Sequence, residues 1–163
     1  MRTYKVQVFK SLLVRDGSVK LTLPGVGELI YNSADCAKLF HIYLKNVDVE
    51  HFVALWLDQK NRIIGLRTVS TGSLTGSLVH PREVFLGTSE GRVASIVLAH
   101  NHPSGNTQPS QLDLATTQRL VQAGKILGIP VVDHIIVGFD YNGDPLPYFS
   151  FVDNDLIANE RIA

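Results

Sequence analysis

Apolar residues follow two different spacings along the chain, and the spacings predict a series of strands and helices. Short unbroken runs of bulky apolar residues, such as VASIVLAH (93–100), are typical of buried strands. Apolar residues three and four positions apart, as in ADCAKLFHIYL (34–44), are typical of a helix with one buried face. The pattern predicts strands at 4–14, 51–58, 62–70, 93–100, 131–138 and 148–153, and helices at 34–44, 81–90, 109–128 and 154–162.

Small polar residues, glycines and prolines predict where these elements begin and end. Ser33 is predicted to cap the first helix, and Pro81 takes the first position of the second. Gly128 and Pro130 end the third helix. The segment 21–30 is interpreted as a loop or short strand. A turn is expected at 16–17, a hairpin turn at 59–61 and a loop at 71–77.

The order of these elements predicts a mixed α/β fold. Helices alternate with strands, but a hairpin also occurs, so a single domain with a mixed β-sheet flanked by helices is expected. The length of 163 residues suits one domain with a sizeable core. The predicted division is an N-terminal strand and loop extension at 1–30, followed by the folded domain at 31–163.

Composition and charge narrow the classes of function. Hydrophobic residues make up 45% of the chain, which argues against disorder. Fifteen basic and fifteen acidic residues cancel, so nucleic-acid binding has no support from net charge, although a local basic patch stays open. The charged residues are mostly basic in segment 1–20 and mostly acidic in segment 140–163. Two solvated ends are the favoured interpretation over a nucleic-acid arm.

The compartment is predicted to be the cytoplasm. Cys36 is the only cysteine, so no internal disulfide can form, and its helical context indicates a buried structural thiol. The first ten residues mix charges with apolar residues and lack a signal-peptide core. No apolar run approaches the roughly 18 residues of a membrane span, so no membrane partner is expected. The oligomeric state is left open.

Two histidines at the end of a predicted strand are the strongest candidates for chemistry. His100 and His102 are two positions apart on an extended chain, so both rings face the same side, and Pro103 ends the strand. Asp113, in the first turn of the next helix, can reach back to them. Two nitrogens and one oxygen would make a three-ligand zinc site with a position open for water. Ser110 and Asp113 also form an S-x-x-D capping box, and capping alone would explain both.

The other titratable residues have simpler interpretations. His41, His51 and His80 are interpreted as structural or exposed histidines. His134, beside Asp133, is a candidate for supporting the site or for contacting the substrate, without being a ligand. The sequence contains no H-E-x-x-H motif, no P-C-x-x-C deaminase motif, no G-x-S-x-G motif, no Walker A loop and no G-x-G-x-x-G loop.

The string HNHPSG followed by PSQLD resembles the JAMM motif of JAB/MPN metalloproteases, and HNHPSG in particular is similar to the bacterial RadC family. Segments 50–64, 76–85 and 131–138 are also similar to RadC, so the resemblance covers roughly 30–150. Two departures from the family pattern are expected. The chain is interpreted as a short form without the N-terminal helix-hairpin-helix-like region, and NTQ (106–108) replaces an acidic continuation after the glycine.

The resemblance implies a deaminase-like mixed sheet and one zinc ion per chain on His100, His102 and Asp113. It implies that Glu50 is the general base, with Glu28 and Glu83 as rivals, and that Ser110 donates to the oxyanion. The expected function is a zinc-dependent hydrolase, most plausibly a peptidase or isopeptidase, acting on an unidentified peptide or protein. The alternatives are a non-catalytic protein- or DNA-binding module associated with DNA repair or mobile elements, and a metal-dependent nuclease.

Overall fold

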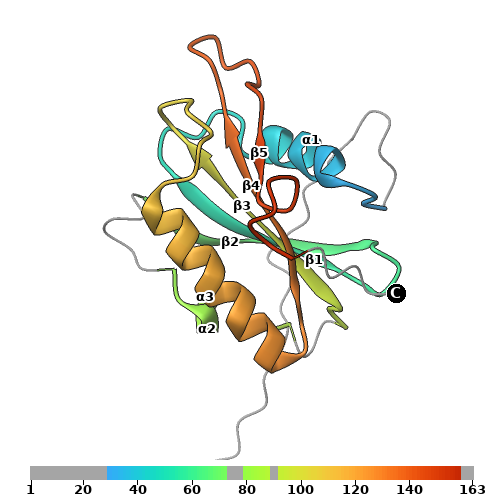
Figure 1. The fold of residues 1–163 in the computed structure, drawn as a ribbon. Helices are drawn as coiled ribbons and strands as arrows, with labels where there is room; N and C mark the ends of the chain where they lie inside the picture. The colour runs from blue at the N-terminus through green and yellow to red at the C-terminus, as the bar shows by residue number, and fades with distance from the viewer. Residues whose placement is uncertain (1–28, 73–78, 89–91, 159–163) are drawn as a thin grey trace, which may run out of the picture.

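The computed structural model describes residues 29–72, 79–88 and 92–158, and over these residues it shows a five-stranded sheet with helices on both faces (Figure 1). No helix within these ranges is long and apolar enough to cross a membrane. The elements in chain order are α1 (Ser33–Tyr43), β1 (His51–Leu57), β2 (Ile63–Thr71), α2 (Pro81–Val84), β3 (Ser95–His102), α3 (Gln111–Leu127), β4 (Val131–Gly138) and β5 (Phe149–Ser150).

The sheet is mixed, as the sequence predicted. Its strand order is β2-β1-β3-β4-β5. Strand β1 pairs antiparallel with both β2 and β3, and β4 pairs antiparallel with β5. Only β3 and β4 are parallel, and α3 is the crossover helix that joins them. This crossover places the C-terminal end of β3 beside the N-terminus of α3, where polar side chains from both can meet.

Alternation along the strands builds two separate cores. In β1, Phe52, Ala54 and Trp56 join the core beneath α3 and α2, whereas the intervening residues of β1 join the core beneath α1. Figure 1 shows α3 and α1 on opposite sides of the sheet. In β3, Ile96 and Leu98 face α3, so the residues that continue this alternation also lie on the α3 face.

The parallel pairing of β3 with β4 contains a register shift. Ile96 pairs with Val131, but Val97 pairs with Asp133, so β4 has one extra residue at this point. Val131 and Ile136 both belong to the α3 side, although they are separated by an odd number of positions. The shift therefore places the even-numbered residues of β4 beyond it, including His134, on the α3 face.

The predicted start of the first helix and the predicted end of the second were wrong. The cap of α1 is Asn32 and not Ser33: the Asn32 side chain accepts from the Asp35 backbone N–H at 2.9 Å, and Ser33 is the first helical residue. The predicted helix at 81–90 ends at Val84, because the backbone N–H of Phe85 bonds to the Pro81 carbonyl and closes only one turn.

The C-terminal predictions were also too long. The strand predicted at 148–153 is the two-residue β5, and residues 154–158 form turns and bends rather than the start of a helix at 154–162. Hydrogen bonds from the backbone N–H groups of Leu156 and Ile157 to the Phe151 carbonyl fold this segment into turns. The expectations for 4–14, 16–17, 21–28, 73–77, 89–90 and 159–162 lie outside the described residues.

Candidate metal centre

His100 and His102 lie at the C-terminal end of β3, just before Pro103, on the face of the sheet that α3 covers. The two Nε2 atoms are 2.9 Å apart, as the two-residue periodicity of a strand predicts. The His100 side chain is completely buried and that of His102 is 17% exposed. The pair therefore reaches from the core to the rim of the sheet.

Asp113 enters the same cluster from the first turn of α3. Its Oδ1 lies 3.4 Å from His100 Nε2, and its Oδ2 lies 3.5 Å from His102 Nε2. Asp113 also completes a capping box, because its Oδ2 accepts from the Ser110 backbone N–H at 2.7 Å while Ser110 Oγ accepts from the Asp113 N–H at 3.1 Å. The Ser110 hydroxyl donates to Asp113 Oδ2 at 2.6 Å. The Asp113 side chain therefore takes part in the helix cap and faces the two histidines at the same time.

Glu50 is the fourth member of the cluster and comes from the residue just before β1. One ligand-type atom from each of Glu50, His100, His102 and Asp113 lies within 4.8 Å of the others. The rival Glu83 lies on α2, where it faces Arg67 and Arg82 across ion pairs of 3.9 and 3.6 Å. The other rival, Glu28, lies outside the described residues.

The chemistry of the donor set fits a cation. The ring Nδ1 of His102 contacts the Asn106 carbonyl, and because a carbonyl only accepts, this nitrogen carries a proton. Once Nε2 of His102 gives up its proton, the lone pair of that nitrogen faces His100 and Asp113 and can bind a cation. Atoms bound about 2.0–2.2 Å from one zinc ion can be up to about 4 Å apart, and the three measured separations fall within that span.

Electrostatics in the cluster also favour a positive charge. Complete burial lowers the pKa of His100 to about 3, and the adjacent His102 acts in the same direction. The hydrogen bond with Asp113 raises the pKa of His102, against the effect of burial. Burial raises the pKa of the Asp113 carboxyl, but hydrogen bonds from His102 and Ser110 outweigh it and hold that pKa well below its usual range. The carboxylate is thus kept as an anion facing two imidazoles.

Three further residues support the cluster, and sequence reasoning missed two of them. His134, on β4, places Nε2 2.8 Å from His100 Nδ1, in line with the prediction that it supports the site. Thr117 Oγ1 lies 2.6 Å from Nδ1 of His134. Thr117 is four residues after Asp113 on α3, and this spacing, which places both on one face of a helix, could have indicated its proximity to the site. Asn101, between the two histidines, bonds to the backbone on both sides of Glu50.

The remaining titratable residues that the sequence singled out lie apart from the cluster. Cys36 is buried, and burial together with Asp133 and Asp35 raises its thiol pKa, as expected for a structural cysteine. His41 packs edge-on against Phe139, with ring centroids 5.5 Å apart. His51 contacts the Val49 carbonyl at 3.0 Å, and His80 is exposed at the start of α2.

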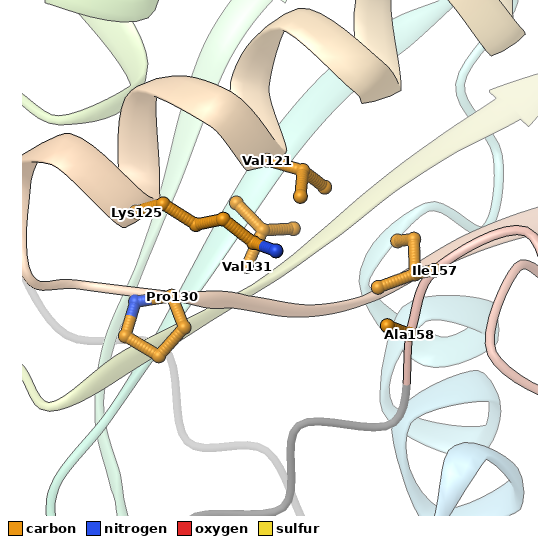
Figure 2. A pocket seen from close by; sticks show the side chains of 6 residues that line it. All are labelled: Val121, Lys125, Pro130, Val131, Ile157 and Ala158. Carbon is orange, nitrogen blue, oxygen red and sulfur yellow. The ribbon is translucent and has the colours of Figure 1, made fainter.

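Asp133 does not face the cluster but binds the C-terminal segment. It accepts from Ser150 Oγ at 2.8 Å and from the Val152 backbone N–H at 3.1 Å. A shallow hollow lies at the far end of α3 from Asp113 (Figure 2). Figure 2 shows the side chains that line it: Val121, Lys125, Pro130, Val131, Ile157 and Ala158. This lining is mostly apolar, so the chemically competent side chains gather at the other end of the helix.

Comparison with known proteins gives one family. The model of the RadC-like JAB domain matches residues 30–156. Similar proteins include the UPF0758 protein of Bacillus cereus (strain B4264), 49% identical over 109 residues that cover 67% of this chain and 48% of the relative. A UPF0758 protein of Rubrobacter xylanophilus is 49% identical over 113 residues, covering 69% of this chain and 50% of the relative. The chain thus spans about half the length of the curated relatives it matches.

Proposed function

Because the chain belongs to the RadC-like JAB domain family, we propose that it is a zinc-dependent hydrolase of the JAMM type that cleaves peptide or isopeptide bonds. The observation that carries the proposal is the convergence of Glu50, His100, His102 and Asp113 at one end of the sheet. Three of these side chains supply the ligand types of a catalytic zinc site, and the fourth is a half-buried carboxylate beside them. A binding module without catalysis would not require this combination.

His100, His102 and Asp113 would hold the ion. Zinc bound there would polarise a water molecule and lower its pKa to about 7. Glu50 accepts a proton from the attacking water and delivers it to the nitrogen of the leaving amine. The Glu50 segment is held in place for this role, since its backbone carbonyl accepts from Gly72 N–H at 2.8 Å and Asn101 binds the residues on either side.

Ser110 is proposed to donate its hydroxyl to the oxyanion that develops on the substrate carbonyl. In the described structure that hydroxyl donates to Asp113 Oδ2 instead. The proposed role therefore requires the Ser110 proton to turn from the carboxylate to the substrate during the reaction. Binding of a cation to Asp113 would favour this turn, because it draws electron density from the carboxylate and weakens it as an acceptor.

The first experiment is elemental analysis of protein purified without added metal. We expect one zinc ion per chain in the wild type and its loss in His102→Ala. His80→Ala is the matched control, since His80 is exposed and lies outside the cluster, and it should keep its zinc. Absence of zinc from the wild type, together with no uptake on titration, would overturn the proposal.

A second experiment separates binding from chemistry. Zinc-loaded wild type and Glu50→Gln would be tested on peptide amides, on peptides joined through a lysine side chain, and on oligonucleotides. The proposal expects amide cleavage by the wild type, with equal zinc content but strongly reduced cleavage in Glu50→Gln. Cleavage of the oligonucleotides alone would replace the peptidase by the nuclease. Zinc binding without cleavage of any substrate in the panel would count against catalysis.

A further inference from the structure

A chain of three buried side chains runs away from the candidate metal centre into the core. His100 Nδ1 lies 2.8 Å from His134 Nε2, and His134 Nδ1 lies 2.6 Å from Thr117 Oγ1. The Thr117 hydroxyl also lies 2.6 Å from the backbone carbonyl of Asp113. The chain therefore starts at one predicted ligand and ends on the backbone of another.

The direction of each hydrogen bond in this chain follows from the group at its end, the backbone carbonyl of Asp113. A carbonyl oxygen only accepts, so the single hydroxyl proton of Thr117 is used toward the Asp113 carbonyl. Thr117 must then accept from His134, so the proton of a neutral His134 is on Nδ1 and its Nε2 carries a lone pair. That lone pair can only accept, so His100 donates to it from Nδ1. The Nε2 of His100 is left with its lone pair directed at His102 and Asp113.

Packing supports this arrangement. His134 and His100 are both 0% exposed, and Thr117 is 1% exposed, so no bulk water competes for these bonds and the charged form of either ring is disfavoured. Phe151 stacks on His134, with ring centroids 4.7 Å apart, and Phe52 stacks on His100 at 5.9 Å. The two phenyl rings limit rotation of the imidazole planes, so the hydrogen-bond directions are maintained.

We propose that Thr117 and His134 are positioning residues that hold His100 in the tautomer protonated on Nδ1, so that its Nε2 is ready to bind the metal ion. The value of this tautomer for metal binding rests on the proposed function, whereas the tautomer itself is a property of the metal-free protein. We call the hydrogen-bonded chain from Thr117 through His134 to His100 the relay. Because Thr117 also bonds the Asp113 backbone, the relay sets the orientation of His100 relative to Asp113, a second predicted ligand.

Two measurements test the relay. Histidine ¹⁵N chemical shifts and long-range ¹H–¹⁵N correlations in the metal-free wild type should show both His100 and His134 protonated on Nδ1 and not on Nε2. Zinc titration should then show about 10–100-fold weaker binding for Thr117→Val, which replaces the hydroxyl with a methyl group of similar size. Thr117→Ser, which restores the hydroxyl, should bind as the wild type does.

Thr116→Val is the matched control, since Thr116 is equally buried on α3 but is not part of the relay. It should leave zinc affinity and tautomers unchanged. A proton on His100 Nε2 in the metal-free wild type would overturn the relay, as would unchanged zinc affinity in Thr117→Val. If Thr117→Val does not fold, the wild-type tautomers alone decide. If the wild type shows both histidines protonated on Nδ1 but never takes up zinc, the proposed function is overturned and the tautomer assignment stands.

Discussion

Asn101 hydrogen-bonds the backbone on both sides of Glu50. Its amide oxygen accepts from the His51 N–H at 2.8 Å, and its amide nitrogen donates to the Val49 carbonyl at 3.1 Å. The Asn101 side chain is buried and takes over where the main-chain pairing of β1 with β3 ends, at Phe52 and His100. A residue between two predicted metal ligands thus orients the predicted general base.

Asn101→Ala is expected to destabilise the fold by about 1–3 kcal/mol, because it removes two hydrogen bonds to part-buried backbone groups. Urea unfolding measures the loss, and amide exchange at His51 should become faster. Zinc content should stay at the wild-type level, because the three predicted ligands are untouched. Asn142→Ala, in an exposed turn, is the control and should leave the stability and the amide exchange at His51 unchanged. Unchanged exchange at His51 in Asn101→Ala would contradict this role.

Ser110→Ala tests the two functions of the Ser110 hydroxyl. Loss of the helix cap should cost about 1 kcal/mol in urea unfolding, and Ser110→Thr should recover most of it. If the hydroxyl also stabilises the oxyanion, kcat of the zinc-loaded enzyme should fall roughly 10²–10³-fold in Ser110→Ala. A loss of stability with an unaltered kcat would restrict Ser110 to capping and to holding Asp113.

Gly138→Ala, on β4, should disturb the candidate metal centre. A methyl group on Gly138 would lie 2.6 Å from the Gly105 carbonyl oxygen, so the loop after β3 must move. This loop contains Asn106, whose carbonyl accepts from His102. We expect a loss of about 1–3 kcal/mol in stability and weaker zinc binding in titration.

Gly65→Ala is the control for that substitution. Its added methyl group would meet only Trp56 at 3.7 Å, an ordinary contact. Zinc affinity in Gly65→Ala should equal that of the wild type. If Gly138→Ala and Gly65→Ala changed zinc affinity equally, the close approach of β4 to the 103–109 loop would not be what sets zinc affinity.

Asp133 should make stability depend on pH. Burial outweighs its hydrogen bonds and raises its pKa, so the native state holds this proton more tightly than the unfolded chain does. The contribution is complete below the unfolded pKa of about 3.9 and is lost as the pH rises through the raised native pKa. The stability of Asp133→Asn relative to the wild type should therefore increase from about pH 4 upward and then level off.

Urea unfolding of both proteins between pH 4 and 8 checks this prediction. Asparagine can still accept from the backbone N–H groups of His134 and Val152, and its amide can donate to the Ser150 hydroxyl. The substitution therefore removes the charge while keeping the hydrogen bonds. A relative stability that is constant with pH, or that decreases as the pH rises, would show that the raised pKa is not the cause.

The sequence alone determined the features that depend on neighbouring residues. It placed β4 at its observed bounds, His100 and His102 on one side of a strand, and Asp113 in a capping box with Ser110. These follow from the two-residue period of a strand and from hydrogen bonds within one helical turn. The cap at Asn32 was missed because adjacent polar residues are equally able to cap by composition.

Only the tertiary structure decided which distant side chains meet. The extra residue in β4 places His134 on the α3 face beside His100, and nothing in the apolar run of β4 marks where that residue lies. The contact of Thr117 with His134 depends on how α3 crosses the sheet, and the position of Glu50 depends on the pairing of β1 with β3. Strand register and helix crossing arise from packing between segments far apart in the chain, so local patterns do not contain them.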